Sequence, residues 1–257
     1  MPPGASGKLS KERPSMSKKQ EPTATPEAAA PKPGTAVLSI QEQIAAQIAR
    51  QNETAQGLRS SGSYIGFKNA QLKVDGISIP ANELNVRVLA ALSERAWYSK
   101  EFDADQVQVP DCYALDNDVP HDAAANPQAG SCAECKHNKW GSATRGKGKA
   151  CRESARVIVI PANVPLASAQ MYTAKVPVTS LSTVTSFTSR CGQANKLMGE
   201  FVTKLSVTED RKTFFKVHLT PVEVTAEMDM AELLKAQDRA YQLAMTPYPE
   251  ISHDQNA

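Results

Sequence analysis

Long apolar runs are missing from this chain of 257 residues. A membrane-spanning helix needs about 18 or more consecutive apolar residues, and no such stretch occurs, so no transmembrane helix is expected. The N-terminus, MPPGASGKLSKERPSMSKKQ, is basic but lacks the apolar segment of a secretory signal. We therefore expect a cytoplasmic protein with no membrane partner.

An excess of one charge is also missing. Lys and Arg number 29 against 27 Asp and Glu, so the net charge is only +2. Affinity for a polyanion must then come from local clustering of charge. The sequence patterns of a phosphate-binding loop, a nucleophile elbow and a zinc protease are absent as well, so we expect no enzymatic activity. An enzymatic alternative, ranked third among the functions, is a metal-assisted nuclease that uses Asp116 or Asp118.

The N-terminal quarter of the chain divides into a tail and a helix. Residues 1–35 hold seven prolines and more basic than acidic residues, which predicts a disordered basic tail. Residues 36–57 predict an amphipathic helix, which starts at a capping box of Ser39 and Glu42 and stops at Gly57. Its isoleucines, at positions 40, 44 and 48, share one face. This face either docks on the protein's own body or meets a partner helix.

From Tyr64 onward the apolar period changes to two, and Asp75-Gly76 is a hairpin turn signal. The strand at 84–92 should place Leu84, Val86 and Val88 on one side and Asn85 and Arg87 on the other. About seven short strands follow one another without regular helices between them. We predict a mainly β domain over residues 58–226, an OB-like antiparallel barrel with a zinc-binding insertion at 110–152.

Two helices are expected near the end of the chain. Residues 181–191 predict a short helix with Leu181, Val184, Phe187 and Cys191 turned inward. Residues 227–257 predict a C-terminal helix and a loose tail. The apolar stripe of that helix is formed by Met230, Leu233, Leu234 and Tyr241.

Four of the five cysteines fall in one stretch with the spacing C-x19-C-x2-C-x15-C: Cys112, Cys132, Cys135 and Cys151. In a reducing compartment such clustering indicates metal binding before disulfides. Two residues between thiolates let both sulfurs reach one tetrahedral ion, and the outer cysteines can close the other two positions. Four sulfurs leave no open position, so the prediction is one structural zinc ion.

Three alternatives remain for this cluster: an iron–sulfur cluster, a site in which His121 or His137 replaces a cysteine, and four free thiols. A redox C-x-x-C is disfavoured because the surrounding strand–helix–strand pattern is absent. The fifth cysteine, Cys191, is expected to be a core residue.

A basic strip lies beside the cysteines. Residues 136–156 hold seven Lys or Arg against Glu153 alone, a net charge of +6. Cations of this kind neutralise phosphates, Gly146 and Gly148 allow close backbone approach, and an exposed Trp140 would stack on a base. The alternative is a solvated loop with Trp140 packed over the metal site. The DNA-binding candidates in this strip are Lys136, Lys139, Trp140, Arg145, Lys147, Lys149 and Arg152.

A second basic and aromatic group, Arg95, Trp97 and Tyr98, ends the long strand. Alternation sends Trp97 and Tyr98 to opposite faces, so one is expected in the core and the other as a second stacking surface. Phe214 and Phe215 split in the same way, and the sequence does not select the outward one.

The segments KVDG, AWYSKEFD, CYALDN and CAECKHNKWGS…GKGKAC resemble those of phage single-stranded-DNA-binding proteins over roughly residues 62–225. The resemblance implies an OB-like barrel with an embedded zinc loop, which coats single strands without sequence specificity during replication or recombination. It also implies replication or recombination proteins as partners, a location in the host cytoplasm, the four cysteines as ligands and the basic residues near Trp140 as backbone contacts. The weakly acidic end, PEISHDQNA, differs from the acidic tail that often recruits partners. A zinc-ribbon module that binds a replication or transcription complex is the second hypothesis.

Overall fold

The computed structural model describes residues 63–100, 108–116 and 118–249, together with Ile40, Ile44, Gln47, Ile48 and Arg50. The chain divides into two compact units, Met1–Leu58 and Arg59–Ala257. In the first unit the five described residues are helical, and the three isoleucines are more than half exposed. The predicted tail 1–35, the capping box at 39 and 42, the stop at 57 and the tail beyond 249 lie outside the described residues. No helix in the described part of the chain is both long and apolar enough to cross a membrane.

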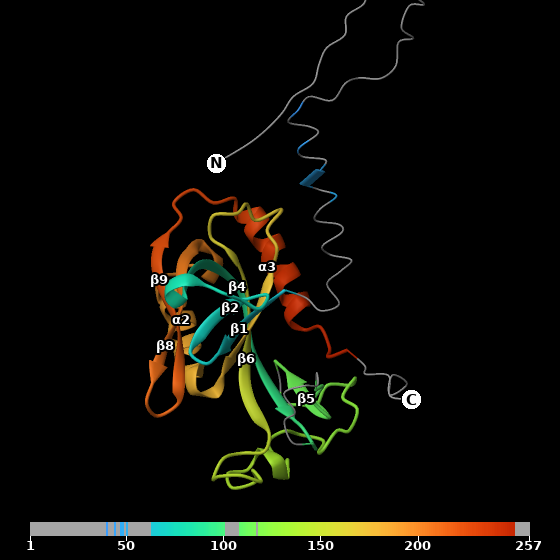
Figure 1. The fold of residues 1–257 in the computed structure, drawn as a ribbon. Helices are drawn as coiled ribbons and strands as arrows, with labels where there is room; N and C mark the ends of the chain where they lie inside the picture. Colours follow the sequence, from blue (N-terminus) through green and yellow to red (C-terminus); the bar gives the residue numbers. More distant parts are fainter. Residues whose placement is uncertain are drawn as a thin grey trace, which may run out of the picture. The chain divides into compact units, whose positions relative to one another are not determined.

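The described residues of the second unit form one curled, mixed sheet, a half-barrel with the strand order β3-β2-β1-β7-β6-β4-β8-β9 (Figure 1). Strand β5 lies off this path and pairs with β4. The strands are β1 Tyr64–Lys68, β2 Gln71–Val74, β3 Ile77–Ser78, β4 Glu83–Trp97, β5 Cys112–Leu115, β6 Arg152–Pro161, β7 Tyr172–Pro177, β8 Phe201–Asp210 and β9 Phe214–Val224. The helices are α2 Leu181–Gln193 and α3 Met230–Ala244, with single 3-10 turns at Pro80–Asn82, Lys136–Asn138, Val178–Ser180 and Met198–Glu200.

The prediction of a mainly β fold with peripheral helices is confirmed, but the sheet is not wholly antiparallel. Strand β7 enters the sheet beside β1 and runs parallel to it, with Tyr64 opposite Thr173. A parallel pair needs a long connection between its strands, and here residues 69–171 supply it. Short hairpin signals in the sequence give no indication of such a distant pairing.

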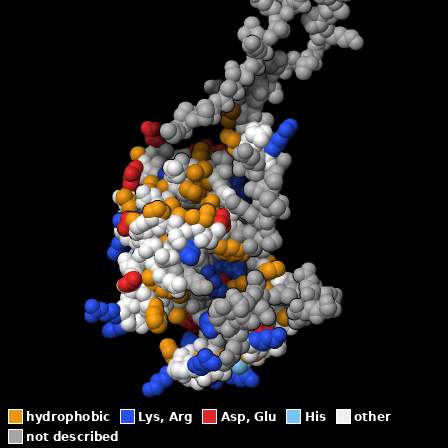
Figure 2. Space-filling view, in the orientation of Figure 1, with side chains coloured by type: hydrophobic (Ala, Val, Ile, Leu, Met, Phe, Trp, Pro, Cys, Tyr) orange, Lys and Arg blue, Asp and Glu red, His pale blue; other side chains and the backbone are white. Residues whose placement is uncertain are grey.

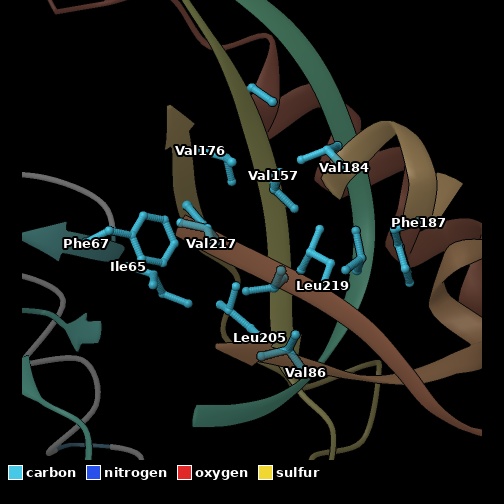
Figure 3. Packing of buried hydrophobic residues seen from close by; sticks show 14 of the residues in the cluster. Ile65, Phe67, Val86, Val157, Val176, Val184, Phe187, Leu205, Val217 and Leu219 are labelled. Carbon is cyan, nitrogen blue, oxygen red and sulfur yellow. The ribbon is translucent and has the colours of Figure 1, made fainter. Parts of the chain in front are cut away.

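The concave side of the half-barrel holds the main hydrophobic core (Figure 3). Alternate residues of the strands point inward, as Ile65 and Phe67 do from β1. Helix α2 packs against the same cluster through Val184, Phe187 and Cys191, which confirms the predicted helix at 181–191 and the core position of Cys191. Its many hydroxyl side chains bond back to carbonyls of the preceding turn, as Thr185 does to Leu181.

Helix α3 covers the convex side of β4 and β6, with a different face from the predicted one. Its N-cap is Asp229, whose side chain accepts from the main-chain N–H groups of residues 231 and 232. Leu233 is buried as predicted, whereas Met230, Leu234 and Tyr241 are exposed. The rest of the buried face consists of alanines, at 236, 240 and 244. Small side chains at this spacing let the helix lie close to the sheet, so the larger residues beside them turn outward.

Strand β4 is the longest of the described strands, and the predicted sides of its first half are confirmed, since Leu84, Val86 and Val88 all face the concave core. Its alternation breaks at a bulge between Val88 and Ala90. Val88 points into the concave core, whereas Leu89 and Leu92 pack under α3. Arg87 lies on the side opposite Val88, as predicted, but it is buried, and its Nη1 donates to the carbonyl of Gly199 at 3.2 Å.

Strand β9 is an edge strand whose free side is partly closed. The main-chain N–H of Val217 donates to Ser180 Oγ at 3.0 Å, and Thr183 Oγ1 donates to the carbonyl of Val217 at 2.9 Å. Further along the strand, Pro221 has no N–H to offer. Side chains of the 178–183 segment therefore take up the free main-chain groups of Val217, and Pro221 offers no N–H to a further strand.

A buried carboxylate, Glu94, ties the sheet to the C-terminal segment. Its oxygens lie 2.6 Å from Arg156 Nε, 2.5 Å from Lys175 Nζ and 2.5 Å from the hydroxyl of Tyr248. Arg156 also donates to the carbonyls of Ala244 and Thr246. Burial would raise the pKa of Glu94, but the charges of Lys175 and Arg156 outweigh it and hold the pKa below its ordinary value.

This arrangement predicts a loss of stability in acid. Because the folded-state pKa of Glu94 lies below the ordinary value of 4.5, the unfolded chain takes up the proton first. The contribution of ionised Glu94 to the free energy of unfolding is therefore fully present above pH 4.5 and is lost as the pH falls through the folded-state pKa. Over that range the free energy of unfolding should fall by up to about 1.4 kcal/mol per pH unit for one proton. Urea unfolding at a series of pH values measures it. Glu94→Gln should flatten this part of the curve, and an unchanged slope would contradict the assignment.

Candidate metal centre and nucleic-acid surface

The end of β4 places two of the four cysteines. Trp97 lies opposite Cys112 of β5, and Ala96 lies opposite Arg152 of β6. Cys151 directly precedes Arg152, the first residue of β6. Cys112 at the start of β5 and Cys151 just before β6 thus both lie at the same end of β4. Strand pairing therefore brings together two cysteines that are far apart in the sequence.

The other two cysteines come from the long loop between β5 and β6, residues 116–151. The main-chain N–H of Cys132 donates to the carbonyl of Asp118 at 2.6 Å. Asn138 holds the C-x2-C turn closed, because its main-chain N–H donates to the carbonyl of Cys135 and its Nδ2 to the carbonyl of Cys132. The N–H of Cys151 donates to the carbonyl of His137 at 2.8 Å, which joins this turn to the start of β6.

All four cysteines are buried free thiols that line one small cavity, together with Arg95 and Trp97. The cavity measures about 10 Å³, which is room for one water-sized sphere and too little for an organic cofactor. Burial raises the pKa of Cys112 and Cys132 and, with the other three sulfurs, that of Cys151 to about 12. A soft cation that stabilises thiolates is the ligand that suits such a donor set.

Among the described residues, no three His, Cys, Asp or Glu side chains are arranged so that they could hold a metal ion.

The two histidines considered as substitute ligands are engaged elsewhere. The ring of His137 stacks on Trp97 with centroids 4.4 Å apart, and its Nε2 lies 3.2 Å from Gln128 Oε1. The ring of His121 stacks on Tyr113, and its Nδ1 accepts from the main chain of Ala123. Neither histidine lines the cavity, so the four cysteines are the better ligand set.

Arg95, predicted to contact DNA, lines the cysteine cavity. Its Nη1 is bonded to Asp118, and its Nε lies 3.7 Å from Glu153, the residue directly opposite it on β6. That Nε is buried and makes no hydrogen bond within the described residues. A buried N–H beside thiols can donate to a thiolate, as the outer partners of metal ligands do. The structure therefore places Arg95 in the wall of the cysteine cavity rather than on an open surface.

The predicted split of Trp97 and Tyr98 is not seen, because both are half-buried. Trp97 is covered by His137, and Tyr98 packs against the small cluster around Tyr113. Neither ring presents an open face comparable with that of Trp140. The strand ends at Trp97, so simple alternation does not extend to its neighbour.

The loop between β5 and β6 carries the most open aromatic and basic surface beside the four cysteines. Trp140 is 79% exposed, which excludes the alternative that it packs over the cysteines. Gly141 and Gly146 take positive φ angles of 83° and 81°, and the N–H of Gly141 donates to the carbonyl of Gly148 at 3.0 Å, so the tip folds back on itself. Blue side chains gather around this end of the molecule, at the bottom of Figure 2. The exposed cations are Lys136, Lys139, Arg145, Lys147 and Arg152.

Two cations of the basic strip make contacts within the protein instead of lying open to solvent. Lys149 lies 2.8 Å from Glu153 and 6.0 Å from the ring centre of Trp140, so it braces the indole. Arg156 is buried in the Glu94 cluster. Glu153 was not predicted as a partner of these cations, although its position as the lone acid in a basic run was a usable signal. Asn138 carried no comparable signal.

No protein-family model, curated protein or solved structure matches the chain. The fold and site therefore define only a class, a β-rich half-barrel with a basic loop anchored beside four buried cysteines.

The two aspartates considered for catalysis are already engaged: Asp118 pairs with Arg95, and Asp116 accepts from the hydroxyl of Tyr241 at 3.4 Å.

Proposed function

We propose that the chain is a non-enzymatic single-stranded-DNA-binding protein that coats single strands, without sequence specificity, in DNA replication or recombination. The half-barrel is then a variant of the OB-like barrel, and the protein resembles those that phages encode. One structural zinc ion, held by the four cysteines, fixes the basic loop. Replication or recombination proteins in the same cytoplasm are its further partners.

The observation that carries this proposal is the loop tip at 136–152. It joins a 79% exposed indole to five exposed cations on a short segment tied at both ends to the cysteine cavity. Cations neutralise phosphates and release counterions, whereas an open ring stacks on any base. This combination suits a flexible single strand, whose bases are accessible, better than a duplex, whose bases are stacked.

Zinc suits the cavity because all four donors are sulfur and the space is of single-atom size. Arg95 supplies a positive charge beside Cys132 and Cys151, which would offset the excess charge of four thiolates around one divalent ion. The ion contributes rigidity and no chemistry, since four protein ligands leave it no open position.

Fluorescence anisotropy of a labelled oligothymidine tests the function. We expect tight binding that weakens steeply as salt rises and that an equal-length duplex competes for poorly. Binding of heparin with equal affinity would show that stacking contributes nothing. If neither nucleic acid binds at low salt, the proposal is wrong.

Trp140→Ala should weaken oligothymidine binding by about 5- to 150-fold, the range for loss of one base stack. The salt dependence should stay nearly unchanged, because no phosphate contact is removed. Trp140→Phe should restore most of the affinity. Equal losses in the Ala and Phe variants would indicate a structural role for the indole instead.

The second candidate, a zinc-dependent protein-interaction module, is favoured by one observation. Ile40, Ile44 and Ile48 are helical and are 76%, 52% and 51% exposed. Such a face fits a partner helix in a replication or transcription complex. Weak nucleic-acid binding together with a stable protein complex that Ile44→Glu abolishes would support this candidate over the first.

A further inference from the structure

The most exposed large apolar side chain of the described residues lies far from the cysteines in the sequence. Phe214, the first residue of β9, is 88% exposed, whereas its neighbour Phe215 packs against the concave core. Phe214 also has a φ of 67°, in the left-handed region. It is the only aromatic residue among the described non-glycine residues with positive φ, and a bulky side chain seldom adopts such a backbone.

The β8–β9 turn holds this conformation through Asp210. One carboxylate oxygen of Asp210 accepts from the main-chain N–H of Lys212 at 3.0 Å, and the other accepts from the hydroxyl of Thr213 at 3.0 Å. The same hydroxyl lies 3.2 Å from the carbonyl of Phe215, and Lys216 Nζ lies 3.6 Å from Asp210. The turn is thus pre-organised, and it presents the Phe214 ring to solvent. A strained, fixed and exposed residue is a candidate for binding.

The charges around the ring select a ligand class. Arg211 and Lys212 are exposed beside Phe214, and Lys216 stands two residues further along the strand. Of the two acids, Asp210 is occupied by the contacts of the turn, and only Glu209 is exposed. An open ring flanked by cations fits a polyanion with stackable bases better than an apolar protein groove. In Figure 1 this turn and the loop that carries Trp140 both lie toward the lower end of the β-rich unit.

We propose that the β8–β9 turn is a second single-strand contact, in which Phe214 stacks on a base and Arg211 and Lys212 bind the adjoining phosphates. This inference rests on the proposed function and extends it. A strand held at two places, the turn and the tip at 136–152, must be long enough to reach both. Short oligonucleotides therefore engage one contact and long ones engage both.

Two variants and a length series test this. In anisotropy with long oligothymidines, Phe214→Ala should bind about 5- to 150-fold more weakly, and Phe214→Trp should bind like the wild type. With the shortest oligothymidine that still binds, Phe214→Ala should have little effect while Trp140→Ala keeps its effect. An abasic strand of the long length should hardly distinguish Phe214→Ala from the wild type.

Val222→Ala is the matched control, since Val222 is another exposed apolar residue of β9 and has no flanking cations. It should leave affinity unchanged at every length. If the wild type binds and Phe214→Ala binds equally well at every length, the second contact is wrong while the proposed function stands. If the wild type fails to bind any strand, both are wrong. Loss of a protein partner by Phe214→Ala, with DNA affinity intact, would make the turn a protein-docking site instead.

Discussion

Replacing Cys135 with Ser is expected to reduce the zinc content from about one ion per chain to nearly none. Zinc in a four-sulfur site needs every ligand as thiolate, and a serine hydroxyl does not replace one. Because binding of a structural zinc contributes directly to folding, the variant should lose several kcal/mol of stability. Metal analysis of purified protein and urea unfolding measure the two effects. Stoichiometric iron with a visible absorption band in the wild type would overturn the zinc assignment.

Cys191→Ala provides the control for this experiment. Cys191 is as buried as Cys135 but lies in α2 against the concave core, and it does not line the cysteine cavity. The variant should lose some core packing and keep its full zinc content. Hydrogen exchange further distinguishes the Cys135→Ser and Cys191→Ala variants. In Cys135→Ser the main-chain amides of residues 118–151 should lose their protection first. Retention of zinc by Cys135→Ser would exclude a site made of these four cysteines.

The second large effect is expected from the loop tip, where four exposed cations are replaced by Gln. Each lost phosphate contact should lower the slope of log affinity against log salt by about 0.7, up to about 3 for four contacts. Near physiological salt this corresponds to a loss of affinity on the order of 100-fold. Anisotropy at several salt concentrations measures both quantities. The substitutions are Lys136→Gln, Lys139→Gln, Lys147→Gln and Arg152→Gln.

Lys235→Gln is the matched single control for Lys147→Gln. Lys235 is exposed on α3, outside the β5–β6 loop that carries the loop tip. Its removal changes the net charge by the same amount but should leave the salt slope unchanged. Equal effects of the two single variants would mean that the protein attracts DNA through its overall charge rather than through the tip. The binding surface would then have to be sought elsewhere.

The sequence predicted the gathering of the cysteines better than their exact arrangement. Spacing alone indicated that Cys112 and Cys151 accompany the C-x2-C pair, and all four line one cavity. Spacing carries no information on strand register, which pairs Cys112 with Trp97 and puts Cys151 directly before the residue that lies opposite Ala96. It also gives no sign that Arg95 turns toward the sulfurs, because its partners Asp118 and Glu153 come from separate segments.

Orientation of aromatic residues was the weakest part of the prediction. Period-two alternation holds in regular strands and fails where a strand ends or turns. Trp97 and Tyr98 lie at such an end, and their predicted split is not seen. The predicted split of Phe214 and Phe215 is seen, but the sequence did not indicate that the turn held by Asp210 leaves Phe214 as the outward ring. Helix α3 shows a related limit: its buried face consists largely of alanines, which a search for large apolar residues overlooks.

If the chain coats single strands as proposed, the partly closed edge of β9 has a consequence. Neighbouring copies on one strand would stand at a very high local concentration, where open sheet edges tend to join and seed fibrils. Here Ser180 and Thr183 already occupy the outward groups of Val217, and Pro221 interrupts the donors further on. Crowded copies could then lie side by side and still separate when the strand is released.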